Sequence, residues 1–363
     1  RLVRDAKLFQ SECERAQAEA LKYFGNGTVF AERYIDCPRH VEVQVFGDGQ
    51  GVAYHLGTRD CSTQRRHQKL VEEAPAPFLS EAIRDRLHSA AVALAERVRY
   101  EGAGTVEFLV HGEEIFFLEM NTRIQVEHPV TEEIYGIDLV EWQFRVAAGE
   151  RLDRELFTKA PCGHAIEFRI YAEDPKRKFS PALGTLTLFS VPNDPFLREE
   201  GWVESGTTVT PYYDAMLTKL IVRGRTRDEA LRESRRILKL CRFEGVQTTL
   251  PFHLWLLHES SFSTCPFEIG FLDHHFVGEA LKNVSLYERI DPEHLSAKGS
   301  GHVPLEFIRV EDSSGAQQVI RIVHRRDGLF EGRIEEGARQ GTALISQTKA
   351  GVLEALQSSS TLG

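Results

Sequence analysis

Two glutamates and an asparagine stand on a predicted β-hairpin. Glu107 lies in the apolar stretch 104–110, and Glu119 and Asn121 lie in the stretch 114–121, with a turn centred on Gly112. Side chains alternate between the two faces of a strand, so Glu119 and Asn121 point to the same side. Pairing around the turn brings Glu107 opposite position 118 or 119, and two carboxylates then approach each other across the strands.

Two carboxylates that face each other on a sheet repel, at a cost of about 0.2–1 kcal/mol, or more when buried. A divalent cation relieves this repulsion, and ligands that are all oxygen suit Mg²⁺ bound to nucleotide phosphates. The alternative is a half-exposed hairpin whose acids face water. The hairpin alone leaves both interpretations open.

A polar segment follows the hairpin directly. Arg123, Gln125 and Glu127 alternate through a stretch that ends at His128-Pro129. A residue before proline favours an extended backbone, and in an extended segment these three side chains share one face. A guanidinium, an amide and a carboxylate on one patch can hold a planar oxyanion and accept its proton. A solvated charged strand fits less well, because the polar face continues the strand that carries the metal-type ligands.

The elements that must position these residues follow from periodicity and capping signals. Four helices are predicted, at 5–24 with Asp5 as N-cap, at 80–98 after Ser80, at 138–148, and at 226–240 behind a Thr226/Glu229 capping box. Predicted strands lie at 28–34, 41–47, 51–57, 104–110, 114–121, 163–171 and 184–190. After a polar linker at 296–301, strands are predicted at 304–310 and 319–325, with a turn at 327–328, and the Ser-rich tail after Leu356 is predicted to be disordered. The fold class is α+β, mainly antiparallel, followed by a small β-rich appendage.

Composition excludes several classes of function. The chain of 363 residues is long enough for two or three domains, and its net charge of -10 argues against nucleic acid as the main partner. No apolar run approaches the ~18 residues that span a membrane. The six cysteines form no C-x-x-C pair, which favours reduced structural cysteines and a cytoplasmic location.

Several blocks of sequence carry a family resemblance. Residues 119–131 (EMNTRIQVEHPVT) and 59–69 (RDCSTQRRHQK) resemble signatures of biotin-dependent carboxylases, as do 38–42 (PRHVE), 172–175 (AEDP) and 211–214 (PYYD). The resemblance runs in order from residue 1 to about 280. It points to biotin carboxylase, an ATP-grasp enzyme that uses ATP and bicarbonate to carboxylate biotin. It implies an ATP-grasp domain at 1–150, starting after the Gly-rich lid, a biotin carboxylase C-terminal domain at 151–285, and a linker with a β-rich segment at 286–363. That last segment is weakly similar to the domains that link the enzyme to its biotin carrier.

The resemblance also implies roles for individual residues. Glu107, Glu119 and Asn121 would hold Mg²⁺ or Mn²⁺ on ATP. Glu127 would deprotonate bicarbonate to give carboxyphosphate, and Arg169 would stabilise the biotin enolate. The bicarbonate site would comprise Arg123, Gln125, Val126 and Lys69. The nucleotide site would comprise Glu32, Arg33, Tyr34, Ile35, His40, Gln64, His67 and Leu109.

The remaining expectations concern partners. Neither Met120 nor Met216 is followed by lysine, so biotin is expected as a substrate on a carrier domain elsewhere, with a carboxyltransferase domain as the further partner. The resemblance also favours a homo-oligomer. The family's N-terminal domain is expected to be missing, and residues 1–363 alone are expected to be inactive. Two alternatives stay open, another ATP-grasp ligase and a non-catalytic docking or dimerisation fragment.

Overall fold

The computed structural model describes residues 1–276, residue 281, and four strands between 303 and 346. The chain divides into two units, Arg1–Pro38 and Arg39–Gly363, which are described separately. The first holds a 3-10 turn (Ala6–Leu8), capped by the Asp5 side chain, and helix α1 (Phe9–Phe24), which ends at Gly25 with φ 71°. The predicted helix is confirmed. The strand predicted at 28–34 is wrong, because no described strand pairs with this segment.

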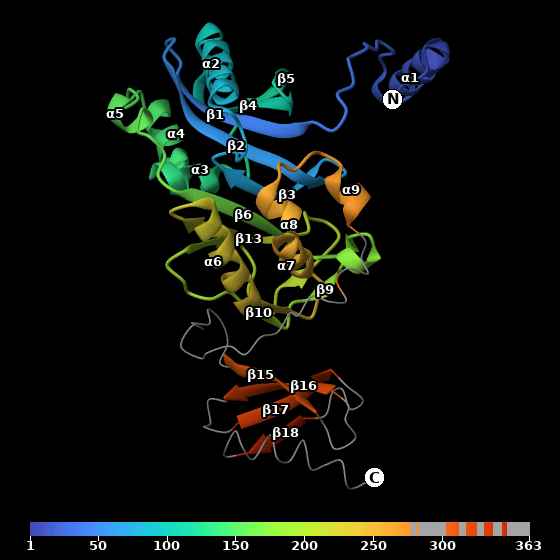
Figure 1. Cartoon of the computed structure of the whole chain (residues 1–363), viewed down its shortest axis with the longest axis vertical. Coiled ribbons are helices and arrows are strands. Elements are labelled where there is room, and N and C mark those ends of the chain that lie inside the picture. Colours follow the sequence, from blue (N-terminus) through green and yellow to red (C-terminus); the bar gives the residue numbers. More distant parts are fainter. Residues whose placement is uncertain (277–280, 282–302, 312–316, 325–329, 337–342, 347–363) are drawn as a thin grey trace. The chain divides into compact units, whose positions relative to one another are not determined.

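One eight-stranded antiparallel sheet forms the centre of the second unit (Figure 1). Its order is β11-β13-β6-β3-β2-β1-β4-β5. The strands are β1 (Arg39–Asp48), β2 (Ala53–Arg65), β3 (Gln68–Ala74), β4 (Glu101–His111), β5 (Glu114–Asn121), β6 (His164–Tyr171), β11 (Leu197–Gly201) and β13 (Met216–Gly224). The predicted strands at 41–47, 104–110, 114–121 and 163–171 are confirmed, and the strand predicted at 51–57 forms the first part of the longer β2. Strands β3, β11 and β13 were not predicted.

Both faces of the sheet are covered around β1, where nine of ten residues are buried. Val41, Val43 and Val45 pack against helix α2 (Glu81–Arg97), which the Ser80 hydroxyl caps as predicted. Because side chains alternate, Glu42 points to the opposite face. A polar row can therefore lie buried on one face while the other face is an ordinary apolar core.

Three helices cover part of the opposite face. They are α3 (His128–Tyr135), α4 (Leu139–Ala147) and α5 (Arg154–Phe157). Their apolar residues pack with Phe46 of β1 and Leu56 of β2. Helix α4 matches the predicted helix and begins after the Asp138 cap. Helix α3 was not predicted.

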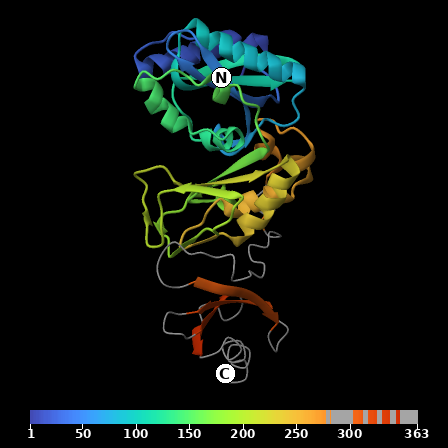
Figure 2. The same ribbon diagram turned by 90° about the vertical axis from the view of Figure 1, so that its left-hand side faces the viewer.

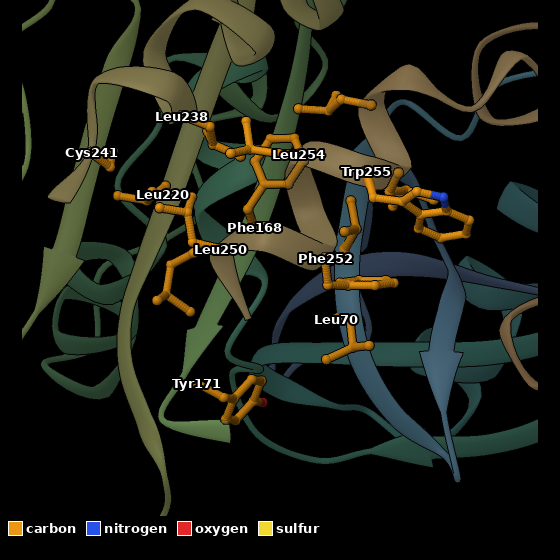
Figure 3. Close-up of a cluster of buried hydrophobic side chains, with 14 of the residues drawn as sticks. Leu70, Phe168, Tyr171, Leu220, Leu238, Cys241, Leu250, Phe252, Leu254 and Trp255 are labelled. Carbon is orange, nitrogen blue, oxygen red and sulfur yellow. The ribbon is translucent and has the colours of Figure 1, made fainter. Parts of the chain in front are cut away.

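The largest apolar core of the described residues packs between helices α6 (Arg227–Leu240) and α7 (Leu250–His258) and the strands β3, β6 and β13. The two helices lie together against β6 and β13 in both views (Figures 1 and 2). Figure 3 shows Phe168 of β6 and Leu220 of β13 among leucines of these helices. The Thr226 hydroxyl accepts from the Glu229 N–H at 3.2 Å, as the capping box predicts. Short helices α8 (Ser260–Thr264) and α9 (Phe271–His275) follow.

Smaller strands complete this region. The strand predicted at 184–190 is divided into β9 (Gly184–Thr185) and β10 (Leu188–Ser190), because each pairs with a different partner. Those partners are β12 (Thr208–Val209) and β14 (Arg242–Glu244). The two remaining short strands, β7 (Glu173–Asp174) and β8 (Ser180–Pro181), pair with each other.

The C-terminal region carries the predicted β-rich appendage. Its four strands form an antiparallel sheet in chain order: β15 (Val303–Glu311), β16 (Gln317–His324), β17 (Phe330–Glu336) and β18 (Ala343–Ser346). The predicted linker, the turn at 327–328 and the tail after Leu356 lie outside the described residues. None of the described helices combines the length and apolar character that a membrane crossing needs. All six cysteines are free thiols.

We expect the contact between α2 and β1 to be essential for stability. Leu87 of α2 is fully buried against the β1 valines. Leu87→Ala should lower the free energy of unfolding by about 2–5 kcal/mol, through lost apolar burial and a residual cavity. Leu21→Ala is the matched control, because Leu21 is 59% exposed. Equal shifts of the urea midpoint for both variants would contradict this account of the core.

Candidate active site

A polar row crosses three neighbouring strands of the buried sheet. Glu42 of β1 is the Cα partner of Glu107 on β4 and of Arg59 on β2. Directly opposed residues point to the same face, so two carboxylates flank one another with a guanidinium beside them. Glu42 and Arg59 are 0% exposed and Glu107 is 5% exposed. The register of the sheet therefore sets the spacing of these charges.

Arg59 uses all five of its N–H donors. Its Nε bonds to Glu42, and Nη1 donates to Gln44 Oε1 at 2.7 Å and to Thr131 Oγ1 at 3.0 Å. Its Nη2 donates to Thr105 Oγ1 at 3.1 Å and to Gln125 Oε1 at 3.2 Å. A buried guanidinium is tolerated when it is paired and fully hydrogen-bonded. Arg59 thus ties β1 and β4 to the segment after β5 and to α3.

Lys69 joins three carboxylates. Its Nζ lies 2.8 Å from Glu42 Oε2, 3.3 Å from Glu107 Oε1 and 2.5 Å from Glu127 Oε1. A β-bulge makes this possible: one step along β2, from Thr63 to Gln64, corresponds to two steps along β3, from 71 to 69. Such a bulge changes the face to which the following side chain points.

Glu127 and Arg169 lie 42 positions apart in the sequence and meet in the site. Arg169 Nη2 donates to Glu127 Oε2 at 2.9 Å, while Lys69 holds the other carboxylate oxygen. The Arg169 carbonyl oxygen accepts from Thr249 Oγ1 at 3.0 Å and lies 2.8 Å from His253 Nε2, at the start of α7. Glu127 is 2% exposed. A carboxylate between two cations can accept a proton from an anion that binds there, and its pKa depends on whether that anion is bound.

The metal-type residues converge as the hairpin predicts. Glu107 and Glu119 are Cα partners, and the Asn121 amide donates to Glu107 Oε1 at 3.0 Å and to Glu119 Oε1 at 3.1 Å. His40 Nε2 lies 2.9 Å from Glu107 Oε2, and Gln64 Nε2 lies 3.3 Å from His40 Nδ1. Among the described residues, one oxygen of Glu42, one of Glu107 and a His40 nitrogen also come within ion-binding reach.

The carboxyl groups of Glu42, Glu107 and Glu127 have pKa values below the ordinary range. Burial opposes ionisation of Glu42, but Arg59 and Lys69 outweigh it and lower its pKa to about 2. Burial likewise opposes ionisation of Glu107, and the bonds from His40, Lys69 and Gln125 lower its pKa to about 2. For Glu127, burial and the nearby Glu42 are outweighed by its cationic neighbours, and its pKa is lowered. All three are therefore anions near neutral pH.

The extended segment predicted before Pro129 is wrong in part. His128 opens α3, because proline is well tolerated in the first turn of a helix. Gln125 and Glu127 are buried together, and the Gln125 amide donates to Glu107 Oε1 at 2.7 Å. Arg123 does not share their face: it is exposed, and its Nη1 donates to the adjacent Ile124 carbonyl.

The other residues predicted for the site lie outside this network of charged side chains. Val126 is held through its carbonyl, which accepts from Lys219 Nζ at 2.8 Å. Leu109 is the Cα partner of His40. His67 is exposed in the β2–β3 turn. The predicted adenine-side residues Glu32, Arg33, Tyr34 and Ile35 belong to the N-terminal unit.

Sequence reasoning missed Arg59 and Glu42 as members of the site. Both lie inside blocks that carried the family resemblance, but a charged residue in a strand is usually solvated. The signal that could have found them was the alternation of β1, where Glu42 falls between Val41 and Val43. A charge between buried positions on a strand with two covered faces needs a partner.

Comparisons with known families cover most of the described core. Residues 1–155 match the model of the carbamoyl-phosphate synthase L chain, ATP binding domain, and residues 167–274 match that of the biotin carboxylase C-terminal domain. A biotin carboxylase of Halalkalibacterium halodurans is 46% identical over 275 residues, 76% of this chain and 61% of the relative. The biotin-dependent acyl-coenzyme A carboxylase alpha3 subunit of Mycobacterium leprae is 53% identical over 242 residues, 66% of this chain and 40% of the relative.

Solved structures of biotin carboxylase domains are also similar to this chain. The biotin carboxylase domain dimer of Hydrogenobacter thermophilus 2-oxoglutarate carboxylase, in complex with MgADP, ADP and bicarbonate, is 42% identical with a TM-score of 0.71. The match covers 77% of this chain and 62% of that one. This chain thus spans about three-fifths of the length of the bacterial biotin carboxylase and biotin carboxylase domain that it matches.

We expect removal of Arg59 to destabilise the protein strongly. Arg59→Met keeps much of the volume but leaves the buried Glu42 short of its guanidinium partner, which should cost about 3–5 kcal/mol of unfolding free energy. Arg123→Met is the matched control, and an exposed arginine should change stability by no more than about 0.5 kcal/mol. Urea denaturation of both variants measures the difference. A small loss for Arg59→Met would show that the hydrogen-bonded network is not a stability requirement.

Proposed function

We propose that this chain, which belongs to the biotin carboxylase family, contributes the site at which bicarbonate is activated by ATP and its carboxyl group passed to biotin on a carrier domain. The family membership rests on the two domain matches and on the relatives. The proposal rests above all on Glu127, a buried carboxylate with one oxygen on Lys69 and the other near Arg169.

Glu127 is the proposed general base. Its lowered pKa keeps it ionised at neutral pH and able to accept a proton. It would take the proton of bicarbonate as a bicarbonate oxygen attacks the γ-phosphorus of ATP, which breaks the bond to the β-phosphate oxygen and gives carboxyphosphate and ADP. Lys69 and Arg169 hold the two oxygens of this carboxylate and can receive the anion. The Gln125 amide, which donates to the neighbouring Glu107, is the further proposed contact. Arg169 is the proposed group that stabilises the biotin enolate.

A Mg²⁺ or Mn²⁺ ion on the nucleotide phosphates is implied by the family. Glu107, Glu119 and Asn121 fit it, because the Asn121 amide nitrogen lies 3.0 Å from a Glu107 oxygen and 3.1 Å from a Glu119 oxygen. A turn of that amide would present its oxygen beside the two carboxylates as a third oxygen ligand. The Asn121 amide now donates to both carboxylates, and an ion there would replace that donor with a stronger counter-charge. Bound there, the ion would neutralise charge on the phosphates.

Further assignments extend the same proposal. We assign the nucleotide to His40, Gln64, His67, Leu109 and residues 32–35, and the bicarbonate pocket to Lys69, Gln125 and Val126. The family resemblance also assigns Arg123 to this pocket, which its exposed side chain would reach by turning away from the Ile124 carbonyl. Lys219 supports the pocket by holding the Val126 carbonyl. The proposed domains remain 1–150, 151–285 and 286–363, although the central sheet continues from β3 to β6 across residue 150. A biotin carrier domain, a carboxyltransferase domain and a second copy of the chain are the proposed partners.

A chimeric enzyme tests the proposed base. The 275 residues of this chain that match the Halalkalibacterium biotin carboxylase would replace the corresponding segment of that enzyme. We expect bicarbonate-dependent ATP hydrolysis that free biotin stimulates, and Glu127→Gln should lower kcat by about 10²–10⁴-fold because the amide cannot accept the proton. Glu141→Gln, in an exposed pair with Arg145 on α4, is the control and should keep the parent rate.

Two outcomes would contradict the proposal. Hydrolysis that does not depend on bicarbonate would favour another ATP-grasp ligase. A folded chimera with no nucleotide turnover would favour the docking role.

We also expect residues 1–363 alone to be inactive. ATP-grasp enzymes hold the nucleotide between two lobes, and even ~1 Å of misplacement can cost about 10²-fold in rate. The matched segment of the Halalkalibacterium relative is 61% of that enzyme. Purified residues 1–363 should therefore give no bicarbonate-dependent release of phosphate above the no-enzyme rate, and measurable turnover would show that this chain is sufficient by itself.

A further inference from the structure

Two buried glutamates beside the site have no role in the chemistry proposed above. Glu72 of β3 and Glu167 of β6 are Cα partners in the antiparallel register, so their side chains lie on the same face. Both are 0% exposed. Arg169, two residues beyond Glu167, points to this face as well.

The pair contacts Arg169 but lacks well-directed hydrogen bonds. Arg169 Nη2 lies 2.6 Å from Glu72 Oε1, and Arg169 Nε lies 3.9 Å from Glu167 Oε1. Within the described part of the chain, none of the four carboxyl oxygens accepts a hydrogen bond of good geometry. These contacts are ion pairs, and they leave Glu167 with very little compensation for its burial.

Counting charges shows an imbalance on this face. Along the row from Glu107 to Glu167, five carboxyl groups are at most 5% exposed: Glu42, Glu72, Glu107, Glu127 and Glu167. Three cations form close contacts with them: Arg59, Lys69 and Arg169. Lys219 of β13 directs its Nζ to Glu200 Oε2 at 2.7 Å and to the Val126 carbonyl. The divalent ion proposed at Glu107 belongs to the β4 end of the row, so the excess negative charge around Arg169 remains.

Because two carboxylates in one buried site cannot both ionise cheaply, we propose that Glu72 and Glu167 share one proton and together position the Arg169 guanidinium. The pair then carries one negative charge. Arg169 Nη2 lies between that charge, at 2.6 Å, and Glu127, at 2.9 Å. The role of Arg169 rests on the proposed function, whereas the shared proton does not.

The environment of each group agrees with a shared proton. Burial raises the pKa of Glu167 well above its ordinary value, and Glu72 and Glu127 add to this against Lys219 and Arg169. Burial and Glu127 raise the pKa of Glu72 to about 7, although Arg169 and Lys69 oppose them. Tyr171 of β6 and the buried Cys61 thiol of β2 also interact with Glu72, and both have raised pKa values and stay neutral. Folding therefore favours the protonated forms. As the pH rises from the ordinary carboxyl range to about 7, ionisation of Glu72 lowers stability, while the raised pKa of Glu167 keeps one proton on the pair.

Infrared spectroscopy of residues 1–363 tests the proton independently of activity. With isotope-labelled glutamate, we expect a protonated carboxyl C=O band that persists near neutral pH and disappears in Glu167→Gln. Glu73→Gln is the matched control, because Glu73 is the next residue on β3 and its bonds from His164 and Arg227 lower its pKa to about 2. A wild-type spectrum without the band would overturn the shared proton, even if no variant folds.

Kinetics of the chimera test the positioning. Glutamine mimics a protonated Glu167 but removes the anion that Glu72 offers to Arg169. We therefore expect Glu72→Gln to lower kcat at least about tenfold more than Glu167→Gln, with KM for ATP unchanged. Glu167→Gln should also abolish the decline in kcat that loss of the shared proton causes at alkaline pH. Equal kcat values for the two variants would overturn the positioning role. An inactive parent chimera with the infrared band present would instead count against the proposed function and leave the proton in place.

Discussion

Burial of the Arg59 guanidinium constrains everything around it. A planar cation with five donors can lie at 0% exposure only if each donor meets an acceptor and a carboxylate balances the charge. The acceptors come from β1, β4, the segment after β5, and Thr131 of α3. A shift of any of these elements would leave a buried donor unpaired, at a cost of about 1–3 kcal/mol. Arg59 therefore fixes the segment that carries Glu127 against the sheet that carries Lys69.

Local signals were sufficient for much of the fold. Helices with a polar cap, such as α2 after Ser80 and α6 after Thr226, were predicted within a residue or two, because the cap and the apolar stripe act within one turn. The hairpin of β4 and β5 was predicted because its turn fixes its register. Strand β13 was not, since it is buried along both faces and lacks the alternation that identifies a half-exposed strand. The segment at 128–135 was misjudged because proline disfavours helix before it yet suits the first turn.

In the candidate site, too, local sequence signals were sufficient for some residues and not for others. Glu107, Glu119 and Asn121 could be placed together from strand alternation alone, since their spacing is local. The local pattern suggested that Glu127 accepts a proton from a bound oxyanion, whereas the roles of Lys69 and Arg169 came only from the family resemblance. Their contacts join residues 42 to 58 positions apart, and no local pattern encodes such a pairing. The sequence analysis did not identify Glu72 and Glu167 for a further reason, which is that a glutamate is normally a solvated charge. Their burial, at 0% exposure, follows from the pairing of β3 with β6, which the sequence does not reveal.

On the proposed function, the same electrostatics connect binding to reactivity. A carboxylate whose pKa is lowered by Lys69 and Arg169 is a weak base, which conflicts with a role in removing the proton of bicarbonate. The conflict is resolved if the anion occupies the space between Glu127 and its two cations. Lys69 and Arg169 would then direct part of their charge to bicarbonate, the stabilisation of ionised Glu127 would fall, and its pKa would rise. We infer that Glu127 becomes a stronger base only when its substrate is bound. Because both cations are also held by other carboxylates, Glu42 for Lys69 and Glu72 for Arg169, they would stay in place as the bond to Glu127 loosens.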